Sequence, residues 1–68
     1  IFYNNIYYIS KKKQIPIGKI EDKANISRGY ITKCRNNNYN MSIDKVTNIA
    51  NVLDESIDDM ILKDFSKL

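Results

Sequence analysis

The 68-residue sequence predicts an all-α fold of five short helices in one domain spanning 1–68. Apolar residues recur at spacings of three and four along most of the chain, which is the period of a helix with one buried face. No segment combines strand-like alternation with turn residues, and the chain has only two glycines and one proline. We expect the helices at about 2–12, 16–24, 28–35, 43–53 and 57–62.

The first two helices are predicted from one apolar face each. In the first, the inward positions are Phe2, Ile6 and Ile9. Lys11–Lys13 close this helix, where cations complement the helix dipole. Pro16 marks the start of the second helix, because a proline is tolerated in the first turn. Asn25 is expected to end it, since asparagine accepts the left-handed conformation.

The remaining helices begin at serines, which are favoured N-cap residues. Ser27 is expected to cap a helix over Arg28–Arg35, with Ile31 and Cys34 inward, and 36–38 to form a loop. Ser42 is expected to cap the fourth helix, whose periodicity is the clearest in the chain: Ile43, Val46, Ile49, Ala50 and Leu53. Ser56, with Asp59 three residues later, resembles a capping box before the fifth helix, against which Phe65 would pack.

The composition excludes several kinds of site. With no histidine and one cysteine, the chain lacks a disulfide framework and the usual zinc-ligand spacings. We find no nucleophile–base pair and no phosphate-binding glycine-rich loop, so we expect neither an enzyme nor a bound cofactor or metal. A lone thiol fits a reducing, cytoplasmic setting. No apolar run approaches the roughly 20 residues of a membrane span.

Charge is distributed unevenly along the chain. Residues 1–40 hold eight cations against two acids, whereas residues 41–68 hold three cations against six acids. Basic charge gathered on one part of a small domain favours a polyanion-binding surface. The alternative interpretation is that these lysines are only the solvent-exposed faces of helices.

The second and third predicted helices have the layout of a helix-turn-helix. Ala24, Asn25, Ile26 and Ser27 join them. Ile26 would fill the space between the two helices, and the next helix would start at once. This geometry projects the first residues of the second helix outward, where a DNA major groove could receive them.

The segments IEDKANISRGYITKCRN (20–36) and SIDKVTNIANVLDESIDDMI (42–61) resemble the Xre/Cro family of lambda-repressor-like DNA-binding domains. The resemblance runs from about Ile6 to Leu62 and continues in register beyond the helix-turn-helix. The matching positions are Ile20, Ala24, Ile26, Ser27, Arg28, Tyr30, Ile31, Lys33, Asn36, Asn40, Ser42, Ile43, Ile49, Ala50, Leu53, Ser56, Ile57, Asp58 and Met60.

The chain departs from the family pattern at several positions. Ile17 stands where the family has a phosphate-contacting glutamine, and Arg35 where the family has a glutamate. Glu21 replaces the small alanine of the helix crossing, so the crossing is expected to be looser or Glu21 to turn outward. Asn25 and Asn37 replace glycines, which is a mild change because asparagine tolerates the same backbone conformation.

The resemblance implies a transcriptional regulator, repressor-like, that binds double-stranded DNA as a homodimer on an inverted repeat. It implies base contacts from the groove-facing positions Ser27, Arg28, Gly29, Thr32 and Lys33. It implies phosphate contacts from the positions Lys19, Asn36, Asn38, Tyr39 and Asn40. Arginine and lysine are the common donors to guanine, and backbone contacts would position the domain without reading sequence.

Other interpretations remain for some of these residues. Cys34 is expected to be a small buried residue rather than a redox sensor, and Tyr30 a packing residue. The tyrosines Tyr3, Tyr7 and Tyr8 would form either a nucleic-acid patch or a packing surface. Lys11–Lys13 would either touch DNA or solvate a helix end. The rival function is a protein-interaction or dimerisation module, such as an antitoxin component, docking through Met60, Ile61 and Phe65.

Overall fold

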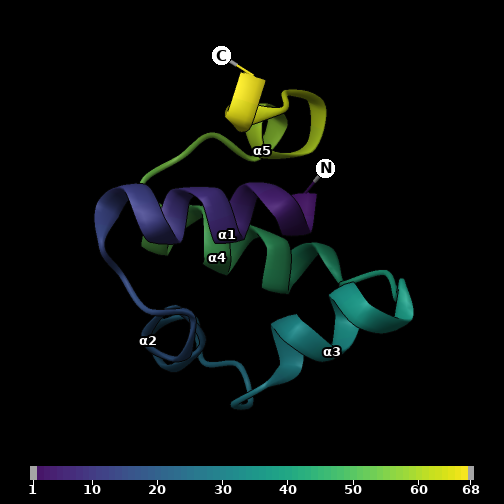
Figure 1. The fold of residues 1–68 in the computed structure, drawn as a ribbon. Helices are drawn as coiled ribbons and strands as arrows, with labels where there is room; N and C mark the ends of the chain where they lie inside the picture. Colours follow the sequence, from purple (N-terminus) through teal and green to yellow (C-terminus); the bar gives the residue numbers. More distant parts are fainter. Residues whose placement is uncertain (1, 68) are drawn as a thin grey trace.

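The computed structural model describes residues 2–67, which form helices and no strands. Their elements are α1 (Phe2–Lys13), α2 (Ile17–Lys23), α3 (Tyr30–Asn37), α4 (Ile43–Leu53), α5 (Ile57–Leu62) and a 3₁₀ turn, η1 (Phe65–Lys67). Helices α1 and α4 occupy the middle of the domain (Figure 1). Helices α2 and α3 lie on one side of them, and α5 with η1 lies on the other. The all-α expectation with five helices is confirmed.

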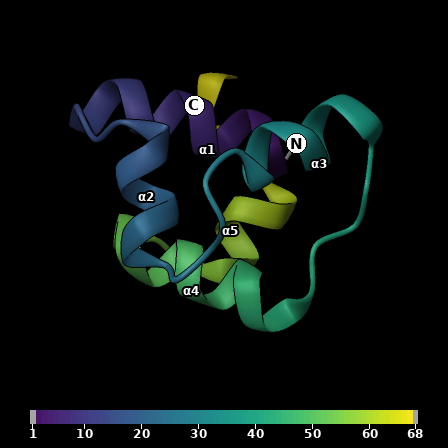
Figure 2. The same ribbon diagram turned by 90° about the horizontal axis from the view of Figure 1, so that it is seen from below.

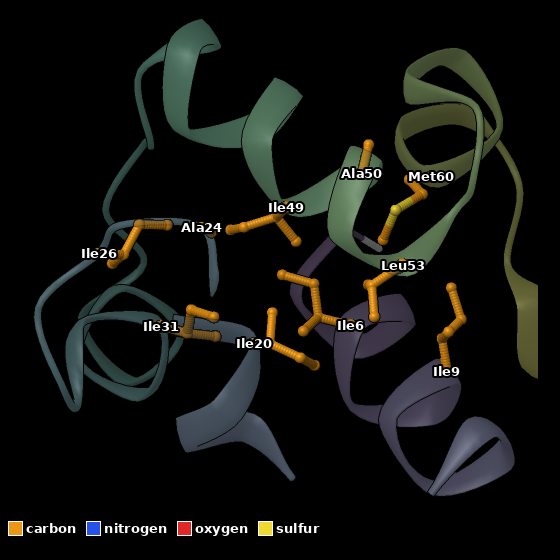
Figure 3. Close-up of a cluster of buried hydrophobic side chains, with 10 residues drawn as sticks. All are labelled: Ile6, Ile9, Ile20, Ala24, Ile26, Ile31, Ile49, Ala50, Leu53 and Met60. Atoms are coloured by element: carbon orange, nitrogen blue, oxygen red, sulfur yellow. The ribbon is translucent and has the colours of Figure 1, made fainter. Parts of the chain in front are cut away.

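The core forms where the predicted apolar faces meet (Figure 3), but Ile43, expected on the apolar face of the fourth helix, is 65% exposed. Ile6, Ile20, Ile31, Ile49 and Met60 come from five different helices, and each is fully buried. Ile26, between α2 and α3, is 6% exposed, as expected for a residue that fills the space between two helices. Because every helix contributes to one cluster, α2 and α3 are supported by the rest of the chain rather than by each other alone.

A buried asparagine ties the two ends of the chain together. Asn5 of α1 is 1% exposed, and its amide nitrogen donates to the carbonyls of Met60 (2.8 Å) and Lys63 (2.6 Å). Its amide oxygen accepts from the backbone N–H of Phe65 (3.0 Å). The carbonyl of Met60 belongs to the last turn of α5, which leaves it without a helical partner, whereas Lys63 caps that helix and Phe65 begins η1. Asn5 therefore terminates α5 and positions η1.

The predicted caps of α4 and α5 are confirmed. The hydroxyl of Ser42 accepts from the backbone N–H of Lys45 (3.4 Å), and that of Ser56 from Asp59 (3.5 Å). Asn25, expected to end α2 in a left-handed conformation, has φ +59°. These local signals worked because each needs only the few residues around it.

The expected start and end of the third helix were wrong. Helix α3 begins at Tyr30 rather than Arg28, and its N-cap is Gly29 in a left-handed conformation (φ +87°) rather than Ser27. It also continues through Asn36 and Asn37, which were expected in a loop, and ends at Asn38 with φ +55°. The side-chain amide of Asn37 donates to the carbonyl of Lys33 (2.9 Å), four residues back in the last turn of this helix.

Two further expectations need correction. Glu21 does not turn outward, because it is 1% exposed and each of its carboxylate oxygens accepts a backbone hydrogen bond. Met60, expected on a docking surface, is fully buried in the core. None of the helices within 2–67 has the length and apolar character that a membrane crossing requires.

Candidate nucleic-acid interface

The residues expected to contact DNA gather around α2, the turn after it, and α3. All ten are exposed: Lys19, Ser27, Arg28, Gly29, Thr32, Lys33, Asn36, Asn38, Tyr39 and Asn40. We call this set the α2–α3 surface. Figure 2 views the molecule from the side of α2 and α3, and shows the segment after α3 running along one edge toward α4. Because α3 begins at Tyr30, Ser27, Arg28 and Gly29 belong to the preceding turn, while Thr32, Lys33 and Asn36 lie on the helix itself.

The start of α3 is held by a side chain from α2. The two carboxylate oxygens of Glu21 accept from the backbone N–H groups of Gly29 and Ile31, each at 3.0 Å. The first N–H groups of a helix have no intrahelical partner, and a carboxylate there also complements the helix dipole. Glu21 therefore replaces the serine cap that the local sequence suggests, and it fixes α3 relative to α2.

Arg28 lies back across α2 rather than along α3. Its Nη2 is 2.7 Å from a carboxylate oxygen of Asp22, an exposed residue of α2. A Cβ atom placed on Gly18 would lie 3.0 Å from Nη1 of Arg28 and 3.1 Å from Cζ. The guanidinium thus rests directly over the backbone of α2, in space that exists because residue 18 has no side chain.

The opposite flank of α3 contacts α1 through a tyrosine. The hydroxyl groups of Tyr7 and Thr32 are 2.6 Å apart. The guanidinium of Arg35 lies 4.5 Å from the centre of the Tyr7 ring, within cation–π range. Tyr7 therefore orients both side chains, and Arg35 rests on an aromatic ring of α1.

The other expected aromatic and basic features have mixed roles. Tyr3 packs on the core, its hydroxyl donates to the carbonyl of Tyr39, and burial, with a smaller contribution from the nearby Cys34 thiol, raises the pKa of its phenol. Tyr30 is half-buried and its ring lies 5.0 Å from the Lys45 ammonium, as expected for a packing residue. Cys34 is a buried thiol, also as expected.

Lysines at the end of α1 do not act as one group. Lys13 donates to the carbonyl of Leu53 and lies 3.7 Å from Glu55, so it secures the end of α4. Lys12 lies 6.0 Å from the ring of Tyr8. Lys11–Lys13 are adjacent in the sequence, but successive positions on a helix face different directions, so their side chains have different partners.

The uneven charge of the sequence is also uneven in space. The ion pairs formed within residues 2–67 involve Lys13, Arg28, Lys63 and Lys67. The last two neutralise acids at the α5–η1 side of the domain. Lys19 and Lys33 are exposed and join none of these pairs. The α2–α3 surface therefore keeps an excess of positive charge.

Comparisons with known proteins found no match. No protein-family model, no curated protein and no solved structure is significantly similar to this chain.

Proposed function

We propose that this chain is a sequence-specific double-stranded DNA-binding domain of the Xre/Cro type, acting as a transcriptional regulator. The observation that supports this most is the arrangement of α3. Its buried face is locked into the core and capped by Glu21, while Thr32, Lys33 and Asn36 are left exposed. A helix that is rigidly held and exposes short polar and basic side chains suits insertion into a major groove.

The loop after α3 would hold the domain on the DNA backbone. Asn38, Tyr39 and Asn40 are exposed amide and hydroxyl donors, and the bond from Tyr3 to the carbonyl of Tyr39 ties this loop to α1. Phosphate contacts from such groups fix orientation without reading sequence. We further propose a homodimer on an inverted repeat in a reducing cytoplasm, and we propose no catalytic step.

Charge reversal at two matched lysines tests this function. Lys33→Glu changes the α2–α3 surface, whereas Lys67→Glu makes the same charge change in η1, where the side chain is 82% exposed. We expect wild-type affinity for random duplex DNA to fall steeply with salt, because phosphate contacts release counterions. Lys33→Glu should weaken binding by roughly tenfold or more, the effect of about 1.4 kcal/mol, and Lys67→Glu should weaken it much less.

Two results would contradict the proposal. The first is wild-type protein that shows no salt-sensitive retention on duplex DNA. The second is an equal loss for both lysine variants, which would indicate a response to net charge rather than contact through α3.

A protein-interaction module is the second candidate, favoured by one observation. Ile61 and Leu62, adjacent in α5, are 42% and 75% exposed, on the side of the domain away from α2 and α3. Exposed apolar side chains that form a contiguous patch are typical of association surfaces. Leu62→Asp separates the two candidates: it should leave binding of the monomer to DNA intact and abolish any association that α5 mediates, measured by sedimentation.

A further inference from the structure

Glycine is an unexpected residue at position 18 of α2. Helix α2 has only seven residues, and glycine is the poorest helix former except proline. Gly18 does not adopt a positive φ, unlike Gly29, so backbone conformation does not explain it. The absence of a side chain at position 18 therefore points to the neighbouring group that packs against this position.

What lies above Gly18 is the guanidinium of Arg28. Three of its side-chain atoms, Nη1, Cζ and Cδ, come within 3.0 to 3.3 Å of where a Cβ atom would be. A carboxylate oxygen of Asp22, one helical turn further along α2, accepts a hydrogen bond from Nη2 of Arg28 at 2.7 Å. The side chain of Arg28 thus packs on the backbone at Gly18 and pairs with the carboxylate of Asp22. We call this packing site, formed by Gly18 and Asp22, the seat of Arg28.

The seat leaves most of Arg28 open to solvent. The side chain is 70% exposed although it is held on two sides. Guanidinium groups bind phosphate oxygens through paired N–H donors, and a group already held in place loses less conformational freedom on binding. Lys19, also exposed, is the next residue of α2 after Gly18. Asp22 would repel a phosphate if it were unpaired, but here its charge is opposed by Arg28.

We propose that Arg28 binds a backbone phosphate of DNA from its seat on Gly18, and that it does not read a base. This inference rests on the proposed DNA-binding function and assigns the ligand of one residue within it. A base contact would require the guanidinium to leave both Asp22 and Gly18 and to extend along α3. A phosphate contact requires neither, so Gly18 and Asp22 are positioning residues for Arg28.

A double-mutant cycle between positions 18 and 28 tests the seat. Gly18→Ala requires Arg28 to move by a few tenths of an ångström, whereas the larger Gly18→Leu fills the seat. Neither changes charge, and both residues are better helix formers than glycine, so both variants should fold. The matched control is Asn51→Leu, at an exposed position of α4. Affinities are measured on a selected duplex and its single base-pair variants, over a range of salt.

We expect Gly18→Leu to weaken binding about tenfold, as Arg28→Ala does, with Gly18→Ala intermediate and the control unchanged; tenfold corresponds to one lost charge-assisted bond. Gly18→Leu should cause no further loss in the Arg28→Ala background. Arg28→Ala should weaken all duplex variants alike and lower the slope of log affinity against log salt by about 0.9.

Four results would overturn the inference. If Arg28→Ala relaxes the preference at one base pair, Arg28 reads a base. If Gly18→Leu weakens binding equally with and without Arg28, the seat does not position it. In the absence of DNA, Gly18→Ala should raise Tm more in the Arg28→Ala background than in wild type, because the new Cβ then meets no guanidinium. Equal Tm shifts in the two backgrounds would refute the seat without any binding measurement. Absence of salt-sensitive binding by wild-type protein would refute the proposed function as well. Because this is measured before any variant is compared, the two failures can be distinguished.

Discussion

Replacement of Glu21 by glutamine should destabilise the domain at one defined point, the start of α3. Glutamine has nearly the same size, but its amide offers one acceptor oxygen where the carboxylate offers two. One of the N–H groups of Gly29 and Ile31, both now bonded at 3.0 Å, would then face an NH₂ group. Because Glu21 is 1% exposed, water does not readily replace the lost bond.

The size of the effect follows from two opposing contributions. A hydrogen bond to a charged group contributes about 1.5–3 kcal/mol. Removing a buried charge recovers part of its desolvation cost, which leaves a net loss of about 1.5 kcal/mol. For a domain of this length, that loss lowers Tm by roughly 6–12 °C.

Glu55→Gln is the matched control, because Glu55 is the second glutamate of the chain and its carboxylate forms a partly exposed ion pair with Lys13, at 3.7 Å. A partly exposed pair of this kind is worth about 0–1 kcal/mol, so its Tm should change little. Thermal unfolding followed by circular dichroism gives both values, and hydrogen exchange at the amides of Gly29 and Ile31 reports the cap directly. Equal Tm shifts for the two variants, or unchanged protection of both amides, would refute the assignment of Glu21 as the cap of α3.

Three other outcomes are expected. Asn5→Leu should cost about 2–4 kcal/mol in urea unfolding, because it leaves the buried carbonyl of Met60 without a donor and removes the part-buried bond to Lys63; a loss below 1 kcal/mol would show that Asn5 does not terminate α5. Tyr3 has a pKa raised above 10.0 in the folded protein, so its stabilisation is complete below pH 10 and is lost as pH rises through the folded pKa. Wild-type Tm should therefore fall more steeply above pH 10 than that of Tyr3→Phe, and parallel curves would contradict this. Tyr7→Phe, which keeps the ring under Arg35 but removes the 2.6 Å contact with Thr32, should cost about 0.5–1 kcal/mol, and no change in either stability or DNA affinity would show that this contact is idle.

Sequence reasoning succeeded where the determining contacts are local. The five helices follow from apolar periodicity, and the starts of α4 and α5 follow from Ser42 and Ser56, whose hydroxyls reach only three residues ahead. The left-handed Asn25 was predictable for the same reason. In each case the signal and the structure that it determines lie within one turn of helix.

Sequence reasoning failed where a distant side chain decides the outcome. Ser27 and Arg28 look like a normal helix start, but Glu21 supplies the cap from another helix and moves the start to Tyr30. Asn5 gave no signal at all, because its partners lie 55 or more residues away in the sequence.

The exposed positions of the candidate site were predicted from the sequence, but the contacts that their side chains make were not. A helical projection places Thr32 outward, and it is exposed, yet its hydroxyl bonds to Tyr7 of α1. Arg28 is also exposed as expected, but it lies over Gly18. The glycine inside α2 was the one sequence signal that could have indicated this, since an interior glycine in a short helix needs a reason.

The most direct test of the account is selection of this protein's targets from a pool of randomised duplex DNA. We expect enrichment of an inverted repeat whose half-sites lie about one helical turn apart, roughly 10 base pairs. The enrichment should disappear with Lys33→Glu and persist with Lys67→Glu. Recovery of no preferred sequence by folded wild-type protein would contradict the claim that α3 reads DNA.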